Sequence, residues 1–261
     1  MPTPYDREGV IALLASAGFV AAAEEAEQLR ARAADNPELL ESMVARRLTG
    51  EPLAWITGRA SFCGLDIRVE PGVYVPRWQT EQLARRAVER LPADGVAIDL
   101  CTGSGAIAKS LMINRPRARV VASDVDERAV ACARANGVEV YKGDLFVPLP
   151  RDLEGRVDLV VAVVPYVPTQ ELARLQRDTF TFESTLAYDG GPDGTRFLRR
   201  VVHGSHRFLR TGGALLLELG GKQAAALRDL LTSLGFVDVA ELVDEEGDGR
   251  GLEATFGGRI A

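Results

Sequence analysis

The stretch VAIDLCTGSGAIA, Val96 to Ala108, decides the fold of this chain. It begins as a short apolar run of the kind that forms a buried strand, and Gly103 and Gly105 then interrupt that pattern. We expect a helix from Gly105 to Asn114. Glycines let the backbone approach a ligand closely, and free N–H groups at a helix N-terminus favour an anionic group. A strand, a glycine-rich turn and a helix in this order indicate a ligand-binding α/β sheet.

The alternation of strands and helices continues from this stretch to the C-terminal part of the chain. Strands are expected at residues 96–100, 119–123, 138–141, 157–163, 214–219, 237–242 and 252–256, and helices at residues 79–90, 105–114, 127–136, 195–209 and 222–234. This order predicts an α/β protein with a doubly wound, mostly parallel sheet. The last two strands are separated by the Gly- and Asp-rich turn at residues 244–251, so we expect them to be an antiparallel addition.

Before residue 76 the pattern is different. Residues 7–50 are rich in good helix formers, with Pro37 at the first turn of a third helix. Apolar and polar residues alternate in residues 60–75 around Pro71-Gly72. This pattern predicts a β-hairpin with its turn at Pro71-Gly72. We therefore expect a small helical cap with a hairpin at residues 1–75 and a main domain at residues 76–261.

Composition excludes several classes of function. The chain has 261 residues, 26% of them charged, and a net charge of −6, which gives no basic footprint for nucleic acid. Three cysteines without a CxxC pair and two histidines argue against a metal site and against disulfides. No apolar run is long enough to span a membrane, and residues 1–6 lack the pattern of a signal peptide. We expect a cytoplasmic protein; its oligomeric state is open.

Acidic residues are expected at the ends of three successive strands. Asp99 ends the first, Asp124 ends the second, nineteen residues after Gly105, and Asp144 follows the third. An acid at the second position can accept both hydroxyls of a ribose, and one at the third can reach an adenine amino group. The turn fits a loose dinucleotide fingerprint, but the acid four residues before Gly103 is better explained by S-adenosylmethionine, which carries a positive charge and an amino group. A tight turn without a ligand is the structural alternative.

At this point the chain resembles a known family, the glutamine N5-methyltransferases that modify release factors, also called PrmC or HemK. The resemblance is carried by GEPLAWITG (50–58), by PGVYVPR (71–77), by DLCTGSG (99–105) and by the segments DGGPDG (189–194) and GGALLLELG (212–220). It implies a Rossmann-like class I methyltransferase fold with a seven-stranded sheet and S-adenosylmethionine as the cofactor. The cofactor-binding residues that we infer are Asp99, Cys101, Thr102, Gly103, Gly105, Asp124, Val125, Asp144 and Leu145.

The chain departs from the family at the end of its fourth strand. The family has Asn-Pro-Pro-Tyr there, and this chain has Val163, Val164, Pro165 and Tyr166. The family's Asn binds the nitrogen that is methylated, whereas valine cannot form a hydrogen bond. An amide placed against Val163 would lose a buried hydrogen bond, which costs roughly 1–3 kcal/mol. The apolar corner instead suits a flat aromatic acceptor. We expect Trp78 to add to the wall of this corner; its alternative role is that of a packed linker residue.

Two further residues are candidates for catalysis. Tyr166 would orient the acceptor or place its ring over the methyl group, and its alternative role is loop packing. Glu183 lies in the loop after the fourth strand and is a candidate base for removing a proton from the acceptor. Its alternative role is that of a solvated loop carboxylate.

These observations lead to one expected function and three alternatives. We expect a methyltransferase that uses S-adenosylmethionine and acts on a small molecule, an aromatic or indole-containing metabolite, at carbon or nitrogen. The alternatives are a release factor glutamine N5-methyltransferase with a protein substrate, a protein that binds the cofactor without catalysis, and a nicotinamide dehydrogenase. The position of Asp99 and the antiparallel strands argue against the last.

Overall fold

A seven-stranded sheet forms the centre of the protein, which we describe from a computed structural model over residues 5–34, 36–174, 181–244 and 246–258. Residues 1–4, which belong to the segment considered for a signal peptide, lie outside these ranges. The strand order is β5-β4-β3-β6-β7-β9-β8. The strands are β3 (Val96–Leu100), β4 (Arg119–Asp124), β5 (Glu139–Lys142), β6 (Val157–Ala162), β7 (Leu209–Glu218), β8 (Phe236–Val243) and β9 (Gly249–Phe256).

The direction of the strands confirms the fold predicted from the sequence. The strands β3 to β7 pair in parallel, β9 pairs antiparallel with β7, and β8 pairs antiparallel with β9. The observed strands differ from the expected ones mainly at β7, which begins five residues earlier, at Leu209.

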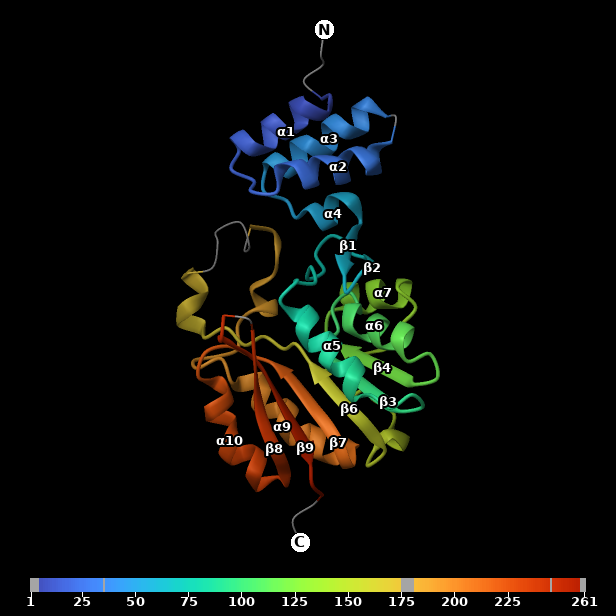
Figure 1. The fold of residues 1–261 in the computed structure, drawn as a ribbon, viewed down its shortest axis with the longest axis vertical. Coiled ribbons are helices and arrows are strands. Elements are labelled where there is room, and N and C mark those ends of the chain that lie inside the picture. The colour runs from blue at the N-terminus through green and yellow to red at the C-terminus, as the bar shows by residue number, and fades with distance from the viewer. Residues whose placement is uncertain (1–4, 35, 175–180, 245, 259–261) are drawn as a thin grey trace.

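Helices cover both faces of the sheet (Figure 1). One face carries α5 (Thr80–Arg90), α6 (Ala106–Asn114) and α7 (Glu127–Ala135), and the other carries α9 (Arg196–Phe208) and α10 (Gln223–Ser233). Each face has its own buried core, so the central strands are apolar on both sides, as expected for parallel strands. None of the helices in the described ranges is long and apolar enough to cross a membrane.

Parallel pairing brings the carboxyl ends of three strands to one edge. Leu100, the last residue of β3, pairs with Ser123 of β4 and with Ala162 of β6. The residues that follow in the chain, Cys101, Asp124 and Val163, therefore lie side by side at this edge. A ligand site at this edge is expected for the fold.

The N-terminal helices form a separate apolar cluster above the sheet (Figure 1). They are α1 (Arg7–Ser16), α2 (Ala22–Ala33) and α3 (Pro37–Leu48). The short helix α4 (Leu53–Thr57) lies between the two parts, since Ile56 packs in the cap cluster and Trp55 in the core of the sheet. The division at residues 75 and 76 stays a prediction.

The hairpin exists, but its turn lies elsewhere than expected. Its strands are β1 (Arg59–Phe62) and β2 (Leu65–Arg68), joined by Cys63 and Gly64. Both turn residues have positive φ, 50° and 73°, which a tight hairpin turn requires. A turn does form at Pro71-Gly72, but the prediction that it closes the hairpin was wrong: it follows the hairpin and leads into an extended segment.

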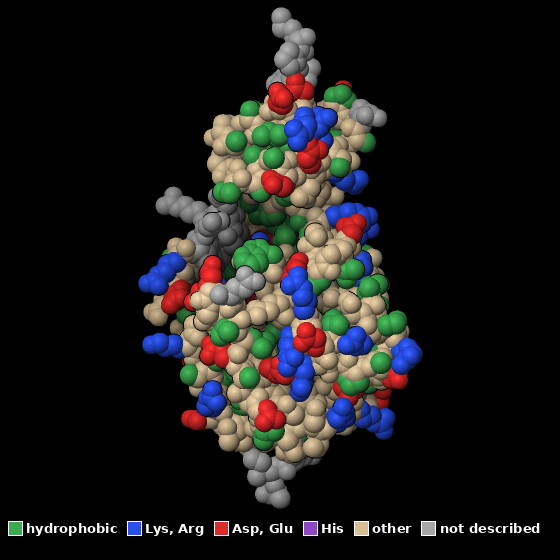
Figure 2. Space-filling view, in the orientation of Figure 1, with side chains coloured by type: hydrophobic (Ala, Val, Ile, Leu, Met, Phe, Trp, Pro, Cys, Tyr) green, Lys and Arg blue, Asp and Glu red, His purple; other side chains and the backbone are tan. Residues whose placement is uncertain are grey.

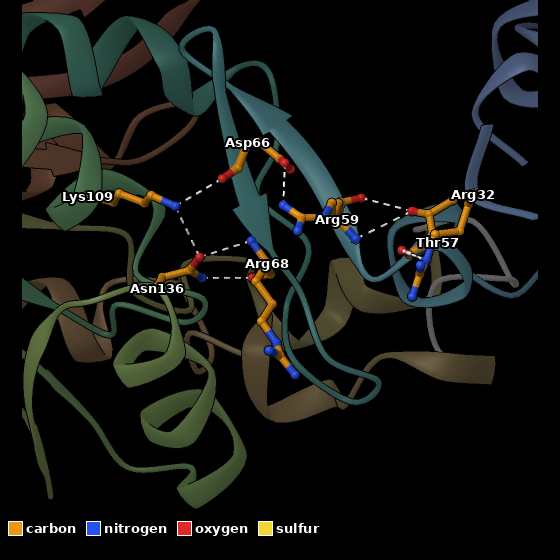
Figure 3. A network of polar contacts seen from close by, with 7 residues as sticks. All are labelled: Arg32, Thr57, Arg59, Asp66, Arg68, Lys109 and Asn136. Carbon is orange, nitrogen blue, oxygen red and sulfur yellow. Dashed lines mark hydrogen bonds and ion pairs between the residues drawn. The ribbon is translucent and has the colours of Figure 1, made fainter. Parts of the chain in front are cut away.

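Asn136 fastens the hairpin to the main domain (Figure 3). Its Oδ1 accepts from the backbone N–H of Arg68 at 3.0 Å, and its Nδ2 donates to the carbonyls of Arg68 and Ser104, both at 2.8 Å. Lys109 adds a bond from Nζ to the carbonyl of Asp66 at 3.0 Å. Because Ser104 belongs to the glycine-rich turn, Asn136 joins the hairpin and that turn directly.

We expect Asn136→Ala to lower the free energy of unfolding by roughly 2–4 kcal/mol, because it leaves buried backbone groups without partners. Denaturant unfolding measures the change. The matched control is Asn114→Ala, whose exposed side chain donates to the carbonyl of Ser110 within its own helix. Equal effects of the two substitutions would contradict the role of Asn136.

Candidate functional site

A cavity of about 340 Å³ lies at the carboxyl edge of the sheet. Its walls come from the turn after β3, the end of β4, the segment after β6, residues 72–77 and the loop at residues 183–188. Figure 2 shows a hollow between the cap and the larger part of the molecule, with hydrophobic side chains in its wall. The cavity brings together most of the residues that the sequence singled out.

Asp99 is a buried carboxyl group at the end of β3. Its Oδ2 accepts hydrogen bonds from the Thr102 hydroxyl at 2.6 Å and from the backbone N–H of Ala108 at 3.1 Å. Burial raises the pKa of Asp99 to about 7, against the lowering effect of these two bonds. No ion pair among the described residues includes Asp99. A buried acid that borders a cavity without a paired cation fits a ligand that brings positive charge, as S-adenosylmethionine does.

Asp124 shapes the turn from the neighbouring strand. Its Oδ2 accepts from the N–H of Gly103 and its Oδ1 from the N–H of Asp126, both at 2.9 Å. Each carboxylate oxygen has a second lone pair, so the side chain can still accept ribose hydroxyls. Val125 follows it in the cavity wall and is largely exposed.

Cys101 and Thr102 also border the cavity. Burial raises the pKa of Cys101, which keeps its thiol neutral. Gly105, by contrast, is absent from the wall of this cavity. It has φ of 81°, and a Cβ there would lie 2.9 Å from Val138 and 3.2 Å from Ala133. The packing of the turn against α7 and against Val138, which precedes β5, is therefore enough to explain glycine at this position.

The two residues expected at the adenine end are not part of this cavity wall. Asp144 forms an ion pair with Arg200, with 2.6 Å between Oδ2 and Nη2, and its side chain is half exposed. Leu145 is buried, and its carbonyl accepts from the Ser123 hydroxyl at 2.7 Å. Asp144 could contact an adenine only if Arg200 shared the carboxylate with the ligand or released it.

The four residues Val163 to Tyr166 form one corner of the cavity. Val164 is buried, and none of the described residues donates a hydrogen bond to its carbonyl oxygen. The Tyr166 hydroxyl donates to Oε1 of the buried Glu218 at 3.1 Å. Burial, and next the charge of Glu218, raises the pKa of Tyr166, so its phenol stays protonated.

The backbone of this corner is held by residues that come later in the chain. The amide Nε2 of Gln223 donates to the carbonyl of Tyr166 at 2.6 Å and to that of Asp193 at 3.3 Å. Gly194 packs against the same carbonyl, since a Cβ there would lie 2.1 Å from the Tyr166 oxygen. The DGGPDG segment is therefore a support for the corner.

Two predicted acceptor-side residues are placed differently from what we expected. Trp78 is 78% exposed and absent from the cavity wall, so the wall that we assigned to it is not formed. Glu183 borders the cavity but is not a solvated loop carboxylate: its side chain is only 4% exposed and pairs with Arg77.

Sequence reasoning missed Arg77, Tyr74 and Tyr188 as members of the site. All three border the cavity, and they surround the carboxylate of Glu183. Arg77 and Tyr74 lie in the PGVYVPR segment that carried the resemblance, and this could have indicated that they belong to the site. Tyr188 directly precedes DGGPDG and had no signal of its own.

Comparison with known proteins agrees with the geometry of the cofactor side. Residues 65–167 match the family described as "Methyltransferase small domain". A release factor glutamine methyltransferase of Geobacter sulfurreducens is 38% identical in an alignment of length 234 that covers 86% of this chain and 80% of that protein. The enzyme of that name from Mycolicibacterium smegmatis is 37% identical in an alignment of length 270 that covers 95% of this chain and 95% of that one.

A solved structure shows the same fold. It is a methyltransferase from Pyrococcus furiosus with a TM-score of 0.56 at 21% identity, and the alignment covers 84% of this chain and 99% of that one. The activity and the cofactor follow from the sequence relatives and the family match: the chain is a methyltransferase that uses S-adenosylmethionine.

The expectation of a small-molecule acceptor, aromatic or indole-containing, was wrong. Relatives at 37–38% identity over most of the chain are named for a protein substrate, and none of the relatives described here is named for a small one. The error came from giving one side chain, Val163, more weight than the stretches that are specific to the family. With similarity of this strength and extent, the chain belongs to the release factor glutamine methyltransferase family.

Proposed function

We propose that this enzyme transfers a methyl group to the side-chain nitrogen of a glutamine in a protein release factor. The observation that carries the proposal is the match to the Mycolicibacterium smegmatis enzyme over 95% of both chains, which includes the cap as well as the sheet. A translation factor as acceptor puts the enzyme in the cytoplasm. On this proposal residues 1–75 are the substrate-facing cap and residues 76–261 the catalytic domain.

On the cofactor side, the proposal assigns charge recognition to Asp99 and ribose recognition to Asp124. The bound S-adenosylmethionine would supply an electrophilic methyl group on a sulfonium. Asp99 would face its cationic methionine end, and Gly103, whose N–H is held by Asp124, would shape the turn around it. These roles use groups that already border one cavity.

On the acceptor side, the proposal relies on the backbone of the corner. The carbonyl of Val164 has no donor among the described residues and can accept from the glutamine amide. Tyr166, fixed through its hydroxyl to Glu218, would hold the flat amide by its ring. Positioning of the nitrogen in line with the methyl group is the main contribution that such a site makes.

The direct test uses labelled S-adenosylmethionine and a full-length release factor that carries its Gly-Gly-Gln loop. We expect one methyl group on the glutamine of that loop, located by mass spectrometry. A factor whose glutamine is replaced by asparagine is the control and should stay unlabelled. If the enzyme binds the cofactor but leaves this glutamine unmodified, the proposed acceptor is wrong.

Val163 provides a second test. We expect Val163→Asn to raise kcat/KM for the release factor by about tenfold or more, because a hydrogen bond to a buried amide recovers roughly 1–3 kcal/mol. Val163→Leu, which has the shape of asparagine without its amide, should give no increase. The dissociation constant of the cofactor, measured by calorimetry, should stay the same in both variants. A loss of transfer in Val163→Asn would count against an amide acceptor.

The pKa of Asp99, about 7, makes cofactor binding depend on pH. Below that value Asp99 is protonated and neutral; above it the carboxylate attracts the cationic ligand. We expect the cofactor to bind more tightly as pH rises from 6 to 8, by up to about tenfold per unit below the pKa. Asp99→Asn should bind more weakly and lose this part of the dependence. Any ionisation of the cofactor itself affects the unaltered enzyme and the Asp99→Asn variant equally. Identical pH profiles of the cofactor's dissociation constant for the two proteins would therefore contradict the role of Asp99.

A further inference from the structure

The carboxylate of Glu183 joins two segments that are more than a hundred residues apart. Its Oε1 accepts from the backbone N–H of Val75 at 3.3 Å. Its Oε2 receives hydrogen bonds from the Arg77 guanidinium and from the Tyr188 hydroxyl, and Arg77 also donates to that hydroxyl at 2.8 Å. Both oxygens of this buried group are therefore engaged.

Aromatic contacts lie on both sides of this ion pair. Phe182 meets Trp55 edge to face, with 6.4 Å between ring centroids, and Tyr188 meets Tyr74 at 5.6 Å. The Trp55 indole also donates to the carbonyl of Val73 at 2.8 Å. Residues 73–77 and residues 182–188 are thus joined directly by hydrogen bonds and by an aromatic contact, and indirectly through Trp55, which contacts both segments. We call these two segments the acceptor clamp.

The same contacts make Glu183 a poor base. A general base must lie within hydrogen-bond reach of the proton that it removes. Here both carboxylate oxygens accept hydrogen bonds from the protein, and Oε2 accepts two of them, from Arg77 and Tyr188. Among the described residues, none of the hydrogen bonds of Glu183 runs to the corner at Val163 to Tyr166.

We propose that Glu183 is a positioning residue, which closes the acceptor clamp and so forms the acceptor side of the cavity. Most residues of the clamp border the cavity, so a change in their spacing changes its shape. The identity of the acceptor rests on the proposed function; the clamp itself does not. No proton passes through Glu183 in this role.

Kinetics distinguish the two roles. Glu183→Gln should lower kcat/KM for the release factor by about tenfold to a hundredfold, as expected for a misplaced acceptor. The cofactor's dissociation constant should change little, and the pH profile of kcat/KM should keep its shape. If Glu183 were the base, the limb of the profile that reports its ionisation would disappear, and this result would overturn the proposal.

Fluorescence tests the clamp without any acceptor. The chain has two tryptophans, so Trp78→Phe leaves the buried Trp55 as the single emitter. Adding Glu183→Gln to this background should shift the emission of Trp55 to longer wavelength, because Phe182 moves away and water approaches the indole. An unchanged spectrum would show that Glu183 does not hold the clamp.

Arg77→Met supplies the partner in a double-mutant cycle. The double variant with Glu183→Gln should be no more impaired than the worse single variant, in kcat/KM and in the Trp55 spectrum, because both changes remove the same contact. Additive effects would contradict the pairing. The control is Asp94→Asn, which removes the exposed ion pair with Arg117 and should change neither readout.

The outcomes separate this proposal from the proposed function. If the unaltered enzyme fails to methylate the release factor, the proposed acceptor is wrong. The Trp55 spectra and the double-mutant cycle read out by them then still show whether Glu183 holds the acceptor clamp together. If transfer to the factor is robust but Glu183→Gln leaves both kcat/KM and the spectrum unchanged, the clamp is wrong and the acceptor stands.

Discussion

Parallel pairing of β3 with β4 and β6 determines where the groups of the site lie. Parallel strands end at a common edge, so the residues after Leu100, Ser123 and Ala162 meet there although they are far apart in the chain. Asp99 lies inside this edge, and no cation among the described residues pairs with its buried carboxyl. Strand direction and this one buried acid therefore determine the character of the cofactor side.

The elements of the sheet were predictable because their signals are local. An apolar run followed by Gly103 and Gly105 indicates a strand and a turn, whatever else the chain does. The turn of the hairpin was missed because Cys63 adopts a positive φ, which no property of cysteine indicates. Pro71-Gly72 had the stronger turn signal, yet the residues after it line the cavity in an extended segment.

The acceptor side was less predictable, since its geometry depends on contacts over long separations. Glu183 meets Arg77 across 106 residues, and spacing in the sequence carries no information about such a pair. Without its partner, Glu183 looked like a free loop acid and hence like a base. Trp78 shows the converse error, since a large aromatic beside the catalytic segment proved to point into solvent.

Position 163 can change without moving the corner, because the corner is held by its backbone. Gln223 fixes the carbonyl of Tyr166, and Gly194 allows the supporting segment to lie against it. Neither contact involves the side chain of Val163. A valine therefore removes one hydrogen bond from the acceptor site but leaves the carbonyl of Val164 and the ring of Tyr166 where the loop puts them. For this reason we expect valine in place of the family's asparagine to weaken the binding of an amide acceptor. We do not expect it to make the site select another class of acceptor.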